Sequence, residues 1–433
     1  VVYLSVGQGS FYTARAVSNV NLEKPIPAHR GLITDRSGVV LAKNTETFSV
    51  LLNAAELLKD RQFFNEVISK LAEVLAVAEA ELAAQVSATN FEQTTAVPVA
   101  RNISPEAAIA VRGLGLKGVS VENDFRREYP GGPAFSTVLG YTGRGETGSA
   151  VMGKAGVENY YDADLRGRDG TYVYTRDVRG TVLDEHVGSA ATPGAKIELT
   201  IDAGLQKYFY DRLKHGLAIL GIKGGVGVAV NPQNGEVLAL VSLPSYDNNI
   251  FMTPGKSAER LEVVNDKSWP LFNRAINGSY NPGSTIKPLV ALAALHENVI
   301  DENYQIYSPG YIDYPNPYDP ERPTRFVDWR PQGWVNVVSA LARSSNVYFY
   351  EIGGGFPAQA STARLDGLGI ERLRHYWQKF GFGAKTGIDA GSENIGFLPS
   401  PDEKQARTGS PWRIGDTYNV SIGQGDLSVS PLQ

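Results

Sequence analysis

The stretch NPGSTIKPLVALAAL, residues 281–295, joins a polar turn to an apolar segment. Apolar side chains recur there at helical spacing, at Ile286, Leu289, Val290, Ala293 and Leu295. This spacing predicts a buried helix that begins close to the turn. Pro288 is compatible with the helix, because a proline near the first turn costs at most one backbone hydrogen bond.

Ser284 and Lys287 lie at the start of this predicted helix, one turn apart and on the same face. A serine hydroxyl needs a base to become a nucleophile. A lysine in an apolar pocket loses solvation, so its pKa falls and its neutral amine can accept the proton. No other Ser-x-x-Lys occurs in the chain. The alternative is that Ser284 only caps the helix and that Lys287 is solvated.

A second polar turn follows about sixty residues later. Val335, Val338 and Leu341 suggest a helix, which Ser344-Ser-Asn346 interrupts before the apolar residues 347–350. Serine and asparagine often break and cap helices through their side chains, which is the alternative interpretation of this turn.

Composition limits the classes of function. The chain has 433 residues, which favours two or three domains. The net charge of −5 predicts no broad basic surface, so nucleic acid is not an expected partner. Cysteine is absent and the five histidines show no ligand spacing, so neither a thiolate, a histidine triad nor a zinc site is expected. No apolar run reaches the roughly 18 residues that span a bilayer.

The N-terminal part has mixed structure. Residues 31–38 predict a strand that enters a turn, and residues 39–42 begin the return strand. Apolar residues between 61 and 90 keep helical spacing and predict one or two amphipathic helices. A boundary is expected at Thr192-Pro-Gly194, which divides the chain into domains 1–192 and 193–433.

The second domain opens with strand, helix and hairpin signals. Residues 197–201 predict a strand, and Asp202 stands where a helix N-cap belongs. Residues 225–230 and 236–241 predict two strands joined by a turn that contains Asn-Gly. The expected fold class is therefore α/β (α+β), with an antiparallel sheet flanked by helices in the second domain.

The two serine motifs together resemble those of the penicillin-interacting serine enzymes. Further stretches resemble the signatures of class B penicillin-binding proteins and cover nearly the whole chain in order. These stretches are residues 30–38, 127–130, 140–141, 153–158, 176–180, 200–202, 412, 415–417 and 421–425. The residue patterns Gly-Asp-Thr at 415–417 and Ile-Gly-Gln-Gly at 422–425 favour the elongation-type member over the division-type member.

The resemblance implies a non-catalytic pedestal or dimerisation-type domain followed by a penicillin-binding transpeptidase domain. It implies a D,D-transpeptidase that cross-links peptidoglycan. Ser284 would be the nucleophile and Lys287 the base, while Ser344 and Asn346 would relay the proton and hold the substrate amide. No metal or organic cofactor is implied.

The resemblance also implies partners and a location. The expected partners are peptidoglycan stem peptides, β-lactams and a membrane glycan polymerase of the shape, elongation, division and sporulation family. The expected location is the extracytoplasmic face of the cell membrane, with an N-terminal anchor that is absent from this sequence.

Lys385-Thr-Gly387 matches the family's third motif in letters only. Its flanks read as loop, and it precedes residues 422–425, whereas the family's motif follows that element. We therefore expect Lys385 to lie on a surface loop more than about 10 Å from Ser284, beyond direct or single-water contact. The true third motif is expected after Gln433, so the transpeptidase domain would be incomplete at its C-terminus.

Two alternatives to a transpeptidase remain open. A β-lactam-hydrolysing or β-lactam-sensing serine enzyme uses the same motifs, but would not be expected to carry so long an N-terminal domain. A non-catalytic scaffold that regulates a glycan polymerase is the other alternative, because nothing in residues 1–190 looks catalytic.

Overall fold

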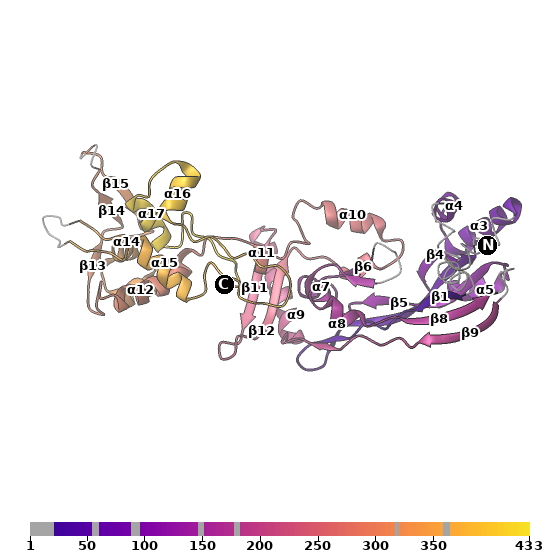
Figure 1. The fold of residues 1–433 in the computed structure, drawn as a ribbon. Helices are drawn as coiled ribbons and strands as arrows, with labels where there is room; N and C mark the ends of the chain where they lie inside the picture. The colour runs from indigo at the N-terminus through magenta and orange to yellow at the C-terminus, as the bar shows by residue number, and fades with distance from the viewer. Residues whose placement is uncertain are drawn as a thin grey trace, which may run out of the picture. The chain divides into compact units, whose positions relative to one another are not determined.

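The computed structural model describes residues 21–53, 60–87, 96–145, 151–176, 182–316, 319, 321–357 and 364–433. The chain divides by packing into two compact units (Figure 1). Unit 1 is Val1–Phe272 with Asp389–Gly391, and unit 2 is Asn273–Ile388 with Ser392–Gln433. Part of the stretch predicted to lead into the second domain, residues 177–180, lies outside the described residues.

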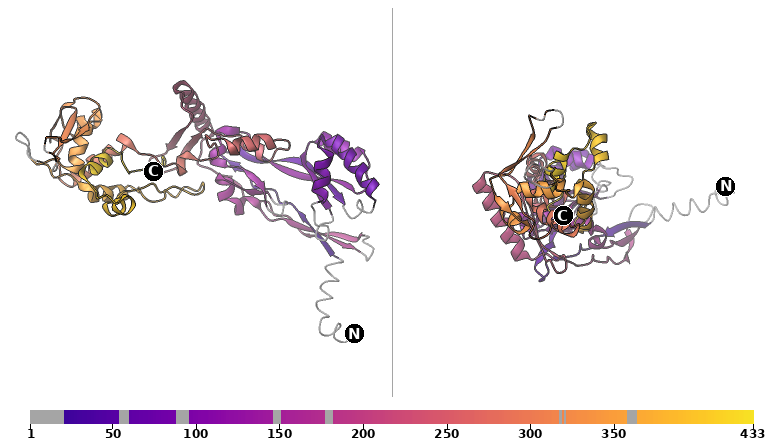
Figure 2. Two further views of the ribbon diagram at one scale, coloured as in Figure 1. Left: turned by 90° about the horizontal axis from the view of Figure 1, so that it is seen from above. Right: turned by 90° about the vertical axis from the view of Figure 1, so that its left-hand side faces the viewer.

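A five-stranded sheet forms the centre of unit 1. Its strands are β2 (Ile33–Thr34), β3 (Val40–Asn53), β4 (Ala96–Ile103), β5 (Val119–Glu128) and β10 (Ile197–Glu198). The long strand β3 pairs antiparallel with both β4 and β5 (Figure 2). Strand β10 pairs parallel with β2. The strand and return predicted at residues 31–42 are confirmed, with Gly38 supplying a positive φ of 90° in the turn.

Three helices contribute to the core beside this sheet: α3 (Arg61–Leu75), α4 (Glu79–Ser87) and α5 (Pro105–Gly113). The predicted amphipathic helices between 61 and 90 are therefore confirmed as two. Asp60 caps α3 by accepting from Gln62 N and Phe63 N, and Val67 and Leu71 of the same helix belong to one buried cluster with Val50 and Leu52 of β3.

Several further elements of unit 1 lie before residue 200. A separate antiparallel sheet has the order β1 (Asn21–Ile26), β8 (Gly170–Arg176) and β9 (Val182–Ser189). The remaining elements before residue 200 are η2 (Gly132–Ala134), α6 (Ser136–Leu139), β6 (Thr142–Arg144), β7 (Val151–Gly153), α7 (Gly156–Tyr160) and α8 (Asp162–Arg166).

A buried ion network ties three distant stretches of unit 1 together. Glu158 of α7 is fully buried and accepts from Arg30 Nε and from Arg127 Nε, each at 2.6 Å. Arg30 also reaches Asp162 Oδ1 at 2.7 Å. Arg30, Arg127 and Glu158 belong to three of the stretches that resemble family signatures, so those signatures have a packing role in the pedestal.

Helix α9 (Ala203–Leu220) and the hairpin of β11 (Gly225–Val230) and β12 (Val237–Leu243) follow. Asp202 accepts from Leu205 N at 2.9 Å, which confirms the predicted N-cap. The predicted hairpin is confirmed as antiparallel. The strand predicted at 197–201 is shorter than expected and comprises only β10.

The sequence boundary predicted at residues 192–193 stays a prediction. The division into packed units follows contacts in the folded chain and does not test a boundary between sequence domains. Residues after 193 are hydrogen-bonded to earlier parts of unit 1. Gln206 Nε2 donates to Ala134 O at 2.7 Å, and Asn248 Nδ2 donates to Gly140 O at 2.9 Å. The packing division consequently falls later, after Phe272. Unit 1 also contains η3 (Asn248–Phe251) and α10 (Ser257–Asn265).

Helices dominate unit 2. They are α11 (Arg274–Asn277), η4 (Gly283–Ile286), α12 (Lys287–His296), α13 (Val337–Arg343), α14 (Asn346–Gly354), α15 (Gly369–Lys379), α16 (Pro401–Thr408) and α17 (Ile414–Ser421). Two small antiparallel sheets pair β13 (Ile306–Ser308) with β16 (Gly333–Val335), and β14 (Tyr311–Tyr314) with β15 (Thr324–Val327). The mixed α/β class is confirmed.

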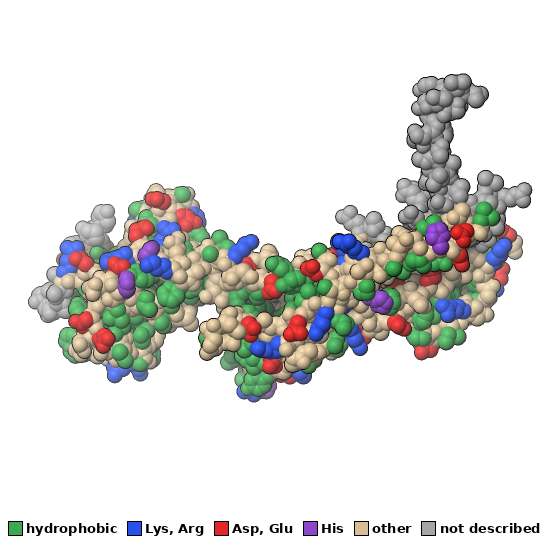
Figure 3. Space-filling model, turned by 60° about the horizontal axis from the view of Figure 1, so that its bottom comes forward, with side chains coloured by type: hydrophobic (Ala, Val, Ile, Leu, Met, Phe, Trp, Pro, Cys, Tyr) green, Lys and Arg blue, Asp and Glu red, His purple; other side chains and the backbone are tan. Residues whose placement is uncertain are grey.

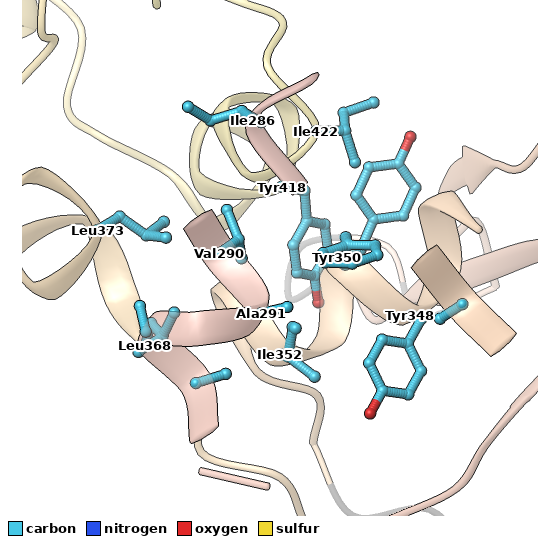
Figure 4. Close-up of a cluster of buried hydrophobic side chains, with 14 of the residues drawn as sticks. Ile286, Val290, Ala291, Tyr348, Tyr350, Ile352, Leu368, Leu373, Tyr418 and Ile422 are labelled. Atoms are coloured by element: carbon cyan, nitrogen blue, oxygen red, sulfur yellow. The ribbon is translucent and has the colours of Figure 1, made fainter. Parts of the chain in front are cut away.

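Helix α14 is the centre of the unit 2 core. Its residues Val347, Tyr348, Phe349 and Ile352 are completely buried. Side chains of α12, α15 and α17 join them in one cluster, part of which Figure 4 shows around Tyr350. A helix that is apolar on nearly every side is fixed by the helices packed around it. The start of α12 at Lys287 and the start of α14 at Asn346 are therefore held in place.

Candidate active site

Ser284 lies in the 3₁₀ turn η4, immediately before α12. The sequence predicts it at the start of the helix itself, and the structure places it one turn earlier. The reason is that regular α-helical bonding begins only at Lys287. Ser284 is exposed while Lys287 is only 2% exposed, so the hydroxyl faces solvent above a buried amine.

The turn that carries Ser284 rests on the stretch after α17. Gly283 N donates to Gly423 O at 2.8 Å, and Asn281 Nδ2 donates to Gly425 O at 2.9 Å. A Cβ atom on Gly423 would lie 2.1 Å from Gly283 O, and Gly423 has a φ of 75°. Glycine is therefore required at 423 both for its conformation and for the close approach.

The Lys287 amine is surrounded by groups from the second serine motif. Its Nζ donates to Ser344 O at 2.9 Å, to Ser344 Oγ at 3.1 Å and to Asn346 Oδ1 at 2.8 Å. The ring of Phe349 lies 5.4 Å from the same nitrogen. The structure thus brings together the residues of both predicted motifs.

Ser344 connects Lys287 to Ser284. Its hydroxyl donates to Ser284 Oγ at 3.0 Å and accepts from Lys287 at 3.1 Å. Hydroxyl hydrogens rotate, so these contacts can also carry a proton from Ser284 towards Lys287. The four residues predicted for the site, Ser284, Lys287, Ser344 and Asn346, form one connected hydrogen-bonded chain.

The backbone of Ser344 is in the left-handed region, with φ 53° and ψ 43°. This conformation ends α13 and lets α14 start two residues later. Serine adopts it rarely, and such residues concentrate at functional sites. The predicted break between two helices is confirmed, but Val335 lies on β16 and Val338 is 66% exposed, so part of the predicted apolar helix pattern is wrong.

Burial lowers the pKa of Lys287 from its usual 10.5 to about 8, and the charge of Asp328 opposes this shift. The ammonium form loses solvation in its pocket, which favours the neutral amine. Lys287 can therefore act as a proton acceptor near neutral pH, which an ordinary surface lysine cannot do.

Asp328 is a residue of the site that sequence reasoning missed. Its Oδ2 atom accepts from Ser345 Oγ at 2.8 Å and from Asn346 N at 2.9 Å. Asp328 lies in an irregular segment between β15 and β16, without any motif spacing to the serines. The only signal was an isolated carboxylate in an otherwise aromatic and basic stretch, which is too common to single out.

Lys385 is exposed and lies in irregular chain, which confirms the predicted loop. Thr386 N and Gly387 N donate to the carboxylate of Glu393, at 2.7 and 2.9 Å. These contacts organise a local turn within residues 386–393. The predicted separation between Lys385 and Ser284 stays a prediction.

Two features are absent from the described part of the chain. No helix there is long and apolar enough to cross a membrane. No group of three or more histidine, cysteine, aspartate or glutamate side chains in these ranges is placed to hold a metal ion. On the face shown in Figure 3, basic and acidic side chains are interspersed, without a field of one sign.

Family comparison identifies the class. Residues 25–199 match the Penicillin-binding Protein dimerisation domain, and residues 225–433 match the Penicillin binding protein transpeptidase domain. The chain belongs to the class B penicillin-binding proteins, as the sequence motifs predicted. The predicted order of a pedestal followed by a transpeptidase domain is confirmed as well.

Among individual proteins, the chain is similar to the peptidoglycan D,D-transpeptidase MrdA of Haemophilus influenzae, with 32% identity over 98% of this chain and 64% of the relative. It thus spans less than two thirds of that protein. The solved complex between penicillin-binding protein PBP2 and MreC from Helicobacter pylori gives a TM-score of 0.80 at 27% identity, covering 95% of this chain and 76% of that chain. A structure described as coordination of polymerization and crosslinking by a peptidoglycan synthase complex gives a TM-score of 0.68 at 27% identity, covering 100% and 72%.

Proposed function

We propose that the protein is a serine D,D-transpeptidase that cross-links peptidoglycan stem peptides. The observation that carries the proposal is the path from the buried Lys287 amine through Ser344 to the exposed Ser284 hydroxyl. A base with a lowered pKa connected to a solvent-facing nucleophile is the arrangement that acyl transfer needs. The similarity to MrdA supports D-Ala-D-Ala peptides as the substrate.

In the acylation step, the neutral Lys287 amine accepts the Ser284 proton through the Ser344 hydroxyl. Ser284 Oγ then attacks the carbonyl carbon between the two D-alanine residues and forms a tetrahedral intermediate. The C–N bond breaks as the Lys287 ammonium returns the proton to the leaving amine. D-alanine departs, and the remaining peptide is held as an ester on Ser284.

In the second step, an amine from a neighbouring stem peptide attacks the ester carbonyl. A new amide bond forms, the ester C–O bond breaks, and the amine's proton returns to Ser284 Oγ by the same path. A β-lactam would acylate Ser284 in the same way. Its ring nitrogen stays attached to the acyl group, so the leaving group does not depart.

Asn346 has a part in both steps. Its Oδ1 atom accepts from Lys287 at 2.8 Å, which orients the amide group. The Nδ2 atom of the same amide is then the donor that would hold the substrate's amide carbonyl. This role needs Asn346 to stay fixed while Lys287 changes protonation state.

The comparisons also support an elongation-type role and a partner. The similar proteins include MrdA, a PBP2 in complex with MreC and a peptidoglycan synthase complex. We place the chain at the extracytoplasmic face of the membrane, with the pedestal domain at residues 1–192 docking to a glycan polymerase or shape protein. The transpeptidase domain would begin at residue 193.

The nucleophile is tested by labelling the full-length protein with a fluorescent penicillin. We expect Ser284→Ala to abolish the label, because the hydroxyl connected to Lys287 through Ser344 is removed. Ser279→Ala is the matched control, since this exposed serine bonds only to Ser428 among the described contacts, and its label should match the parent. Full labelling of Ser284→Ala would disprove the assignment.

A further inference from the structure

The segment from Asp328 to Gln332 is fixed at both ends to the region of β13. Asp328 N donates to Gly310 O at 2.8 Å, and Gln332 N donates to Ser308 O at 2.9 Å. These backbone bonds fix the position of an irregular segment beside α13 and α14, the two helices that flank the second serine motif. The segment is therefore a fixed support.

The same segment is bonded to the last residue of α13. Trp329 Nε1 donates to Arg343 O at 3.2 Å, and Arg343 Nη1 donates to Gln332 O at 3.1 Å. Arg343 immediately precedes Ser344, so the residue before the left-handed turn is held from the side of residues 328–332. These two bonds fix where the turn begins.

The carboxylate of Asp328 holds the other side of the turn. Its Oδ2 atom accepts from Ser345 Oγ at 2.8 Å, Asn346 N at 2.9 Å and Val347 N at 3.2 Å, and Oδ1 accepts from Trp329 N at 2.8 Å. The two amides are the first of α14, where a negative charge is favourable. The carboxylate is buried and has no position to move to without breaking several of these bonds.

Asp328 also acts on Lys287 by its charge. Burial is the larger influence on the pKa of Lys287 and lowers it, and Asp328 is the charged group that raises it. The other groups that face the amine, Ser344, Asn346 and Phe349, carry no charge. Without the Asp328 charge, the Lys287 pKa would fall further below 8.

The remaining titratable groups beside Asp328 do not change charge in the useful pH range. Burial first, and then the charge of Asp328, raise the pKa of Tyr350 to about 12. Arg330 lies within the segment, and Arg343 donates to Gln332 O. Glu351 also lies on α14, and burial raises its pKa to about 8 with no contribution from Asp328. A shift of the midpoint on loss of the Asp328 charge therefore reports on Lys287, whose pKa Asp328 does influence.

We propose that Asp328 is a positioning residue for acyl transfer, an inference that rests on the proposed function. Its carboxylate fixes the start of α14 so that Asn346 stays hydrogen-bonded to the Lys287 amine. Its negative charge favours the protonated form of Lys287. Asp328 makes no hydrogen bond to Ser284 among the described contacts and acts through the turn at residues 345–347 and through Lys287.

The test uses Asp328→Asn and Asp328→Ser in the full-length protein. Asparagine keeps the size of the side chain and an acceptor oxygen for the first amides of α14 while removing the charge. Serine removes the charge and also shortens the side chain, so its hydroxyl no longer reaches these amides. The second-order rate of acylation by a fluorescent penicillin is measured from about pH 6 to 9.5. In the parent, the rate should rise with pH to a plateau, with a midpoint near 8.

We expect both variants to move this midpoint to lower pH and to lower the plateau rate by about tenfold or more, since a charged hydrogen-bond acceptor is lost. Asp313→Asn is the matched control, because Asp313 pairs with Arg325 on the β14–β15 hairpin, and its profile should equal the parent's. Thermal unfolding of each variant checks that it is folded.

The possible outcomes separate two failures. If either folded variant keeps the midpoint and plateau of the parent, Asp328 has no positioning role and the inference is overturned. If a variant loses rate but keeps the parent midpoint, Asp328 is only a structural cap and the inference is again overturned. If Ser284→Ala still labels in the same experiment, the proposed function fails instead.

Discussion

The proposed role of Lys287 depends on the burial of its amine, which the Ser-x-x-Lys pattern alone does not predict. The sequence predicts a Ser-x-x-Lys at a helix start, and that pattern fits a solvated lysine as well as a base. In the structure the amine is buried and bonded to Ser344 and Asn346. The lowered pKa follows from this burial, so the decisive property comes from residues about sixty positions away.

A pair of lysine substitutions tests this difference. We expect Lys287→Ala to lower the rate of penicillin acylation by about 10²–10⁴-fold, because general-base assistance is lost. Lys385→Ala should leave the rate unchanged, since Lys385 is exposed in a loop. Stopped-flow or gel-based acylation of the two full-length variants decides it. A large effect of Lys385→Ala would place the tripeptide 385–387 in the active site.

Short sequence motifs predict four residues of the site, but no motif predicts Asp328. Ser284, Lys287, Ser344 and Asn346 were all named from the sequence, and the structure brings them together. Asp328 acts largely through backbone amides of Asn346 and Val347, which every residue type supplies. No pattern of side chains could mark such a contact in advance.

Elements with local signals were predicted well. Helix α9 begins after its predicted cap Asp202, and the hairpin of β11 and β12 turns at Asn-Gly. The short pair β13 and β16 was not predicted, because its three-residue strands carry too few residues for a period and pair across a long separation. Val335 was consequently placed in a helix when it belongs to that sheet.

The contact between the nucleophile turn and the stretch after α17 leads to a prediction at the level of elements. Gly423→Ala would place a Cβ atom 2.1 Å from Gly283 O at a φ of 75°. The turn must then shift, and we expect penicillin acylation to fall by about tenfold or more, because an error of about 1 Å in a reacting group can cost 10²-fold.

Gly216→Ala is the control for this substitution. Gly216 lies inside α9, and a Cβ atom there would meet nothing within 4 Å. Alanine in a helix interior is favoured over glycine by about 0.5–1 kcal/mol, so this variant should label normally and unfold at a slightly higher temperature. Normal acylation by Gly423→Ala would mean that the turn adapts to the side chain.

For the whole molecule, the class and the order of domains were predictable because signatures occur along most of the chain. The family and the pedestal–transpeptidase order are confirmed by matches at 25–199 and 225–433. The extent of packing was not predictable. The bonds of Gln206 and Asn248 to backbone carbonyls of unit 1 join residues that lie far apart in sequence and show no shared motif.

The proposed partner gives a prediction for the pedestal. Val39 is 51% exposed at the turn before β3, within the pedestal domain that is proposed to dock to the polymerase. We expect Val39→Glu to weaken co-purification with the glycan polymerase, because a charge would have to be desolvated at the contact. Penicillin labelling of the same variant should match the parent. Undiminished recovery of the polymerase would exclude Val39 from the contact.

The buried network of Arg30, Arg127 and Glu158 has a consequence for biosynthesis. A ribosome adds about 5–20 residues per second and releases the N-terminus first. Arg30 precedes Glu158 by 128 residues, so it waits on the order of ten seconds for the carboxylate that neutralises it. The interval between synthesis of strand β2 and synthesis of its partner strand β10 is longer still. During this interval the edge of β2 that β10 will pair with is unpaired, so we expect chaperones that shield exposed strand edges to raise the yield of the folded pedestal.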